Sequence, residues 1–182
     1  MCTFITATLP ASADTPRFRA LVQEHGLAFA PLHNAHVSAL LTPSERYYRA
    51  TRAQCDCRCS LPGPPHRRPL NAQVAALRAK GWSESKIDKW RRSKEPGPPR
   101  ETVRAAHEPS YDTWVGFLTA ALALDEVRHV GLLKHDYRGA IDDEAVPFTR
   151  APRTLAEVRE RSLVWLEDVL YEVRDPARYE RW

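Results

Sequence analysis

The spacing of apolar residues along the chain predicts a small number of strands. Residues 3–9 are β-branched or apolar and stop at Pro10, a pattern that is typical of a strand. Similar runs predict further strands at 27–30, at 46–51, at 130–135 and at a segment that ends near Val146 and Phe148. Because Arg138-Gly139-Ala140 separates the last two, we expect a turn there that brings them together as partners.

Apolar residues at helical intervals follow two polar start signals. Asp14 or Thr15 is expected to cap one helix, which Gly26 ends. Ser110 or Asp112 is expected to open a second helix that is apolar almost all round, so this helix should lie at the centre of the core.

The C-terminal region also shows helical spacing. Thr154-Leu155-Ala156-Glu157 fits a capping box. The stripe that predicts a helix after it consists of Leu163, Leu166, Val169, Leu170 and Val173. Since strands and helices do not alternate regularly along the chain, we expect an α+β fold, with a small, largely antiparallel sheet packed with helices.

A proline-rich region interrupts the expected core. Proline clusters at 62–65 and 96–99 are typical of extended linkers, because proline joins neither a helix interior nor a sheet ladder. Between them Gly81 separates two short helical patterns, and Ser83 is expected to cap the second. Residues 1–182 are therefore expected to form a single domain that carries a proline-flanked helical insertion at about 66–100.

Charge is distributed unevenly, although the net charge is only +4. Residues 67–104 contain eleven Lys and Arg against four acids, whereas residues 105–182 contain ten against fifteen. The residues expected to bind an acidic protein partner on the second helix of the insertion are Lys86, Lys89, Trp90, Arg91 and Arg92. A solvated charged face is one alternative. Nucleic-acid binding is another, because two helices joined by a tight turn are the outline of a DNA-reading unit.

The candidate metal ligands are the four cysteines, Cys2, Cys55, Cys57 and Cys59. If the 46–51 strand continued through the last three, their side chains would share one face, because strand residues two apart do so. If it also paired antiparallel with 3–9, Cys2 would lie beside them. Four thiolates could then bind zinc tetrahedrally. Inert cysteines, a thiol-dependent enzyme and an N-terminal nucleophile at Cys2 after loss of Met1 are the alternatives.

Two weaker groups of polar residues have simpler explanations. His33 and His36 are expected to be surface histidines, because no carboxylate nearby completes a metal site. A solvated acidic turn is favoured over a site for a hard cation at His135, Asp136, Asp142, Asp143 and Glu144.

The sequence offers no sign of secretion or of a membrane span. Residues 1–10 contain no Lys or Arg, and the longest apolar run, near 114–124, is about half the length that a span needs. We therefore expect a cytoplasmic protein with no membrane partner. No GxSxG or HExxH motif is present, so an enzyme is not the favoured interpretation.

Four segments carry a resemblance to known sequences: Met1-Cys2-Thr3-Phe4-Ile5-Thr6, Tyr47-Tyr48 leading to Cys55-Asp56-Cys57, Gly81-Trp82-Ser83, and 167–173 (EDVLYEV). Together they resemble an uncharacterised family of small bacterial proteins, over most of the chain. The resemblance implies a bacterial cytosolic setting and no particular activity. Cys59 is additional to the Cys-x-Cys pair of that family.

Three functions therefore follow from the sequence. The leading prediction is a non-enzymatic interaction module of adaptor, regulatory or toxin-neutralising type, which uses its charged surfaces. The first alternative is a zinc-binding thiolate protein or a thiol-dependent enzyme centred on Cys2, Cys55 and Cys57. The second is a nucleic-acid-binding protein that uses the basic helical insertion.

Overall fold

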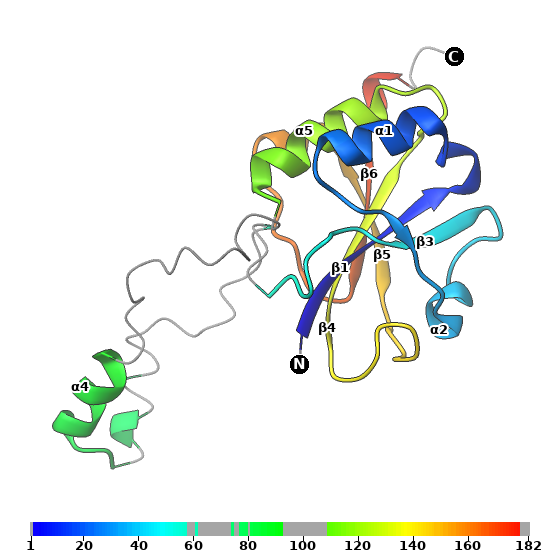
Figure 1. Ribbon diagram of the computed structural model, residues 1–182. Coiled ribbons are helices and arrows are strands. Elements are labelled where there is room, and N and C mark those ends of the chain that lie inside the picture. Colours follow the sequence, from blue (N-terminus) through cyan, green and yellow to red (C-terminus); the bar gives the residue numbers. More distant parts are fainter. Residues whose placement is uncertain are drawn as a thin grey trace.

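A six-stranded sheet forms the centre of the molecule (Figure 1). The computed structural model describes residues 2–57, 61, 74, 77–79, 81–92 and 109–178. The strands are β1 (Cys2–Pro10), β2 (Ala30–Pro31), β3 (Glu45–Arg49), β4 (Val130–Tyr137), β5 (Thr149–Thr154) and β6 (Val169–Arg174), in the spatial order β2-β3-β1-β4-β6-β5. All neighbouring strands are antiparallel except β5 and β6. The expected α+β fold with a largely antiparallel sheet is confirmed.

Helix starts follow the capping signals in the sequence. The helices are α1 (Pro16–Glu24), α2 (Ala35–Ser38), α4 (Glu84–Arg92), α5 (Tyr111–Leu122) and α6 (Leu155–Arg159), with 3-10 turns at Ala11–Ala13 and Pro176–Arg178. Thr15 caps α1 and Ser110 caps α5, each by accepting a backbone N–H with its hydroxyl. The capping box of Thr154 and Glu157 at the start of α6 is also present.

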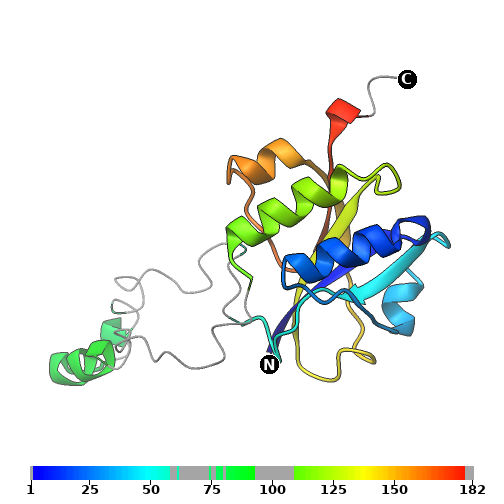
Figure 2. The same cartoon turned by 45° about the horizontal axis from the view of Figure 1, so that its top comes forward.

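One face of the sheet is covered by α1, α5 and α6, which lie side by side (Figure 2). Alternate residues of β1, Ile5, Ala7 and Leu9, are fully buried beneath them. The helix α5 contributes Trp114 and Phe117 to the same core, and both are fully buried. The expectation that this apolar helix lies at the centre of the core is therefore confirmed.

The opposite face has a smaller core and a polar bridge. Tyr47, Leu133 and Tyr137 are buried there beneath α2 and the loop that follows β4. Arg150 of β5 donates to Glu45 of β3 at 2.9 Å and to Glu172 of β6 at 2.6 Å. Three strands, β1, β4 and β6, lie between β3 and β5 in the sheet order, so Arg150 links two strands that are not neighbours in the sheet.

The expected long C-terminal helix is wrong. The helix α6 ends at Arg159, and residues 169–174, which include Val169, Leu170 and Val173 of the predicted stripe, form strand β6. Arg161 adopts a left-handed φ of 56°, and the Ser162 N–H returns to the carbonyl of Glu157, which ends the helix. Asp168, at a φ of 58°, leads into the strand.

Two strand expectations also need correction. The segment before Val146 and Phe148 does not pair with β4, because β6 occupies that edge of β4 and β5 pairs parallel with β6. The carboxylate of Glu144 instead accepts the backbone N–H of Arg138, which holds the intervening loop in a turn. The strand expected over 27–30 is confined to Ala30 and Pro31, because Phe29 has a φ of 41°.

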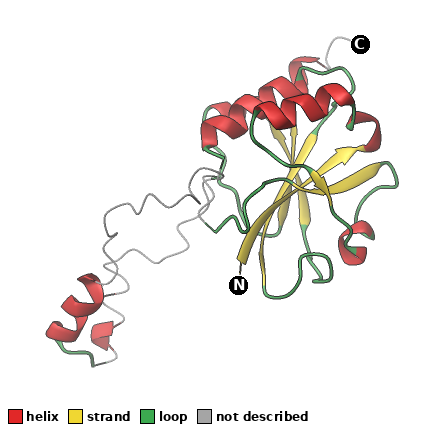
Figure 3. Cartoon of the chain, in the orientation of Figure 1, coloured by secondary structure: helices red, strands yellow, loops and turns green. Residues whose placement is uncertain are grey.

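The predicted insertion is only partly described. Helix α4 follows Gly81, whose φ of 75° suits glycine, as the spacing of the two helical patterns indicated. In Figures 1 and 3 α4 lies away from the sheet. The two proline clusters lie outside the described residues, so the limits of the insertion remain a prediction. No helix in the described parts of the chain is long and apolar enough to cross a membrane.

Candidate functional site

The chain segment after β3 continues along the edge of β1. Strand β3 ends at Arg49, but the Ala50 N–H donates to the carbonyl of Ile5 at 3.1 Å. Further on, the Asp56 N–H donates to the carbonyl of Thr3 at 2.7 Å. The sequence-based hypothesis of a strand that continues through the cysteines is therefore wrong. Cys55 and Cys57 lie in an irregular segment that meets β1 again near the first residue of β1.

Asp56 fixes this irregular segment in place. Its side chain is only 1% exposed, and Oδ2 accepts the Ile5 N–H at 2.8 Å and the Thr51 hydroxyl at 3.0 Å. A carboxylate thus satisfies a backbone donor of β1 that has lost its strand partner, because β3 has already ended. Sequence reasoning missed this role, since an aspartate between two cysteines also suits a solvated turn.

Three sulfur atoms meet where this segment reaches β1. The Sγ atoms of Cys2, Cys55 and Cys57 all lie within 4.8 Å of one another, and none of the three cysteines forms a disulfide. The Thr3 backbone N–H also donates to Cys57 Sγ at 3.4 Å. The juxtaposition expected from antiparallel pairing of β1 and β3 is confirmed for these three residues, here named the thiol cluster. Cys59 lies outside the described residues.

Hydrogen bonds favour a single thiolate at Cys57. Burial would raise the pKa of Cys57, but hydrogen bonds from the Thr3 backbone and from the Cys55 and Cys2 thiols lower it overall. The backbone N–H of Cys57 favours a Cys55 thiolate, but the hydrogen bond from the Cys55 thiol to Cys57 raises the pKa of Cys55 overall. The lowered pKa of Cys57 favours metal binding, because a cysteine must lose its proton to become a ligand.

The dimensions of the thiol cluster fit a thiolate metal site. Sulfur atoms bound tetrahedrally to zinc at about 2.3 Å stand roughly 3.8 Å apart, so the three Sγ atoms need to approach only slightly. Cys2 and Cys57 are exposed and Cys55 is half-buried, so an ion can reach them from solvent. Within the described ranges, no other group of three Cys, His, Asp or Glu side chains is arranged to hold a metal.

The predicted partner-binding residues lie on α4, away from the thiol cluster. Lys86 and Lys89 are exposed, Trp90 and Arg91 are half-buried, and the side chain of Arg92 is not described. Lys86 Nζ lies 4.2 Å from the centre of the Trp82 ring. These residues share one short helix, and their role in binding remains a prediction.

The structure separates the two weaker groups of polar residues named in the sequence analysis. His33 and His36 are exposed, as expected. His135 is buried and bonds through Nδ1 to Asp168 at 2.5 Å. Glu144 accepts the backbone N–H groups that begin the turn after β4. This acidic region therefore stabilises a loop, and its carboxylates do not converge on one point.

A search of protein-family models, curated proteins and solved structures finds no match to this chain. The resemblance to an uncharacterised bacterial family therefore stays a prediction. Function must be argued from the residues themselves.

Proposed function

We propose that the protein binds a thiophilic metal ion, zinc in the first instance, through Cys2, Cys55 and Cys57. The observation that carries this proposal is the convergence of three sulfur atoms from two segments that lie more than fifty residues apart in the chain. Thiolate ligands favour zinc and copper(I) over hard cations such as magnesium or calcium. Zinc completes its tetrahedron with a fourth donor, for which Cys59 or a water molecule is available.

Exposure of the cluster argues against inert cysteines. A cysteine that only fills space is usually among the most buried residues of a protein. Here Cys2 and Cys57 are exposed and Cys55 is half-buried at the margin of the sheet, while the neighbouring Asp56 is buried and holds Cys55 and Cys57 in place. A bound ion would link the start of β1 to the segment after β3, and so would stabilise that margin.

Cobalt(II) titration of the reduced, metal-free protein tests the proposal. We expect sulfur-to-cobalt charge-transfer bands, the visible bands of a tetrahedral ion, and displacement of cobalt by about one equivalent of zinc. Cys55→Ser and Cys57→Ser should each remove most of the charge-transfer intensity.

Cys59→Ser identifies the fourth donor, because it makes the same chemical change two residues further along the chain. If water is the fourth ligand, this change should leave the charge-transfer intensity unaltered. If Cys59 is the fourth ligand, the intensity should fall by the contribution of one sulfur. Absence of charge-transfer bands in the unmodified protein, together with no zinc in elemental analysis of freshly purified protein, would overturn the proposal.

A second proposal concerns α4, whose exposed Lys86 and Lys89 favour an acidic protein partner. The helix carries two acids, Glu84, which pairs with Arg78 at 2.7 Å, and Asp88, but its four Lys and Arg residues outnumber them. Poly-glutamate should bind the protein in a salt-sensitive way and weaken when Lys86 and Lys89 are changed to Glu. Tighter binding to a DNA duplex than to poly-glutamate would favour the nucleic-acid alternative instead.

A further inference from the structure

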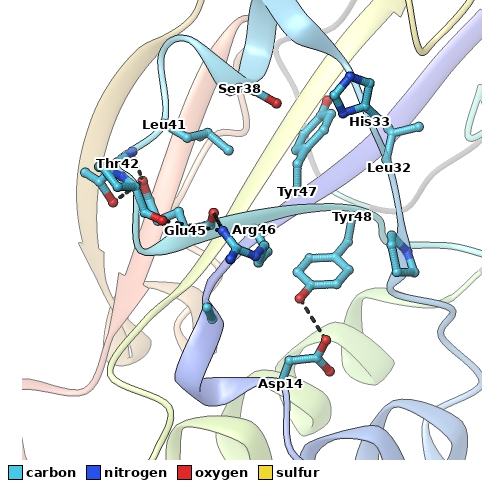
Figure 4. Close-up of a pocket in the computed structure, with 13 residues that line it drawn as sticks. Asp14, Leu32, His33, Ser38, Leu41, Thr42, Glu45, Arg46, Tyr47 and Tyr48 are labelled. Carbon is cyan, nitrogen blue, oxygen red and sulfur yellow. Dashed lines mark hydrogen bonds between the residues drawn. The ribbon is translucent and has the colours of Figure 1, made fainter.

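A cavity of about 650 Å³ lies at the opposite end of β1 from the thiol cluster. Its lining comes from β3, from the turn after β1 and from the chain between β2 and β3 (Figure 4). This volume is within the range of small-molecule sites, which is about 300–1,000 Å³. Leu32 and Leu41 give it apolar sides, and the consecutive residues Tyr47 and Tyr48 border it from opposite faces of β3.

Internal ion pairs fix the walls of this cavity. Asp14 pairs with Arg19 and accepts the Tyr48 hydroxyl at 2.9 Å. Burial, reinforced by the bond to Asp14, raises the pKa of Tyr48 to about 12, so its hydroxyl stays a neutral donor. On the other side, Glu45 accepts from Arg150 at 2.8 Å and from the Thr42 N–H at 2.8 Å. The site is therefore built before any ligand arrives.

These pairs leave an uneven balance of charge around the cavity. Both lining carboxylates, Asp14 and Glu45, are neutralised by arginines of the protein itself. Arg46 has no such partner in the described part of the chain, and its Nη1 reaches only the carbonyls of Glu45 and Pro43, at 3.2 and 3.4 Å. The lining therefore carries one positive charge that the described protein does not balance.

Two further polar side chains border the same cavity. His33 and Ser38 both line it and are exposed, and neither side chain hydrogen-bonds to another described residue. Figure 4 shows them near Tyr47, while Arg46 lies between Glu45 and Tyr48. The guanidinium of Arg46 therefore lies on the Tyr48 side of β3, whereas the imidazole of His33 and the hydroxyl of Ser38 lie on the Tyr47 side.

We propose that this cavity binds a small molecule with one anionic head group, a carboxylate or a phosphate, and an apolar body. The guanidinium of Arg46 would hold the head group with two parallel hydrogen bonds, which suits the geometry of both anions. His33 and Ser38, on the other side of β3, would bond polar atoms at the far end of the molecule. The apolar body would lie against Leu32 and Leu41. This site does not depend on the metal proposal, because it shares no residue with the thiol cluster.

Amide NMR titration of the full-length protein with benzoate, phenyl phosphate and neutral benzamide tests the inference. We expect the anions to shift signals of residues 31–33 and 41–48, with dissociation constants of about a millimolar, as suits such small probes. Benzamide should bind at least about tenfold more weakly, because it lacks the charge. The tighter of the two anions identifies the head group.

Arg46→Ala should weaken binding of the better anion by about tenfold or more, and Arg46→Lys by less. Arg46 is exposed, so neither change should alter the thermal unfolding temperature appreciably. Arg138→Ala, which removes an exposed arginine that does not line the cavity, is the matched control and should bind normally. The inference fails if benzamide binds as well as the anions, if Arg46→Ala has no effect, or if neither anion shifts these signals.

Discussion

At the scale of single residues, buried carboxylates do much of the work of positioning the two candidate sites. Asp56 replaces a missing strand partner beside the thiol cluster, and Glu45 anchors one wall of the cavity. Neither role follows from the sequence, because an acidic residue next to polar neighbours is more often a solvated one. Only the hydrogen bonds that reach them from distant segments show the difference.

Asp56→Ala should lower the free energy of unfolding by about 1–3 kcal/mol, because it leaves the buried Ile5 N–H without its acceptor. It should also weaken cobalt binding, since Cys55 and Cys57 flank this residue. Urea denaturation and the cobalt titration measure the two effects. Asp143→Ala, which removes an exposed carboxylate, is the control and should change stability by less than about 0.5 kcal/mol.

The ion pair of Glu45 and Arg150 makes a prediction about acid stability. Burial would raise the pKa of Glu45, but hydrogen bonds from Arg150 and Thr42 lower it from 4.5 to about 2. Because the folded-state pKa is depressed, this stabilisation is fully present above pH 4.5 and is lost as the pH falls through about 2.

Arg150→Met should therefore destabilise the protein by about 3 kcal/mol at pH 7, because it leaves a buried charge. The difference from the unmodified protein should shrink between pH 5 and pH 2, as Glu45 becomes protonated in both. Urea denaturation across this range measures it, and Arg138→Met is the control. A difference that stays constant with pH would show that Glu45 does not carry the effect.

At the scale of elements, the sequence predicted those parts whose signals are local. The strand at 3–9 and the helix after Ser110 were correct because their burial patterns and caps are contiguous in the chain. The C-terminal helix was wrong because Val169, Leu170 and Val173 suit either a helix stripe or a buried strand. Arg161 and Asp168, which interrupt the predicted helix, both have left-handed backbone conformations. Glycine or asparagine is the usual residue in such a conformation, so the sequence contained no signal that the helix would end there.

The close contact of β1 and β4 gives a prediction at this scale. A Cβ atom at Gly131 would stand only 2.0 Å from Thr8 Oγ1 and 3.1 Å from Leu170 Cδ1. Gly131→Ala should therefore destabilise the fold by about 1–3 kcal/mol through overpacking.

Thr8→Ala should recover part of this loss when the two changes are combined, because it removes the nearest atom. A double-mutant cycle in urea measures this coupling. Strictly additive effects would mean that the clash is relieved elsewhere in the sheet.

At the scale of the whole molecule, the sequence predicted the approach of Cys2 to Cys55 and Cys57 but not the path of the chain between them. The pairing of two strands can be predicted from their sequence patterns. The path of the irregular segment from Ala50 to Cys57 cannot, because it follows no repeating hydrogen-bond pattern. The cavity could not be predicted at all. Its residues are scattered over 11–48 and carry no motif, and only the pairing of β1 with β3 and the path of the chain around α2 bring them together.

The predicted insertion can be tested by removing it. Replacing residues 66–100 with a Gly-Ser linker of about ten residues should leave the core folded, with a change in the free energy of unfolding of no more than about 2 kcal/mol. Shortening the loop lowers the entropic cost of closing it, so we expect a small increase in the free energy of unfolding. Urea denaturation and an amide NMR spectrum measure the result. Loss of the folded spectrum would show that the removed segment belongs to the core.

The order of strands in the sheet has a consequence for synthesis. β1 lies between β3 and β4, and its Cys2 is paired with Tyr137, far along the chain. At ribosomal speeds, roughly ten seconds pass between translation of β1 and translation of β4. For most of that time Ile5, Ala7 and Leu9 lack the cover of α5 and α6 and their second partner strand, although α1 and β3 have already been made. Until β4 and α5 are made, the apolar face and one edge of β1 are open to aggregation on the nascent chain.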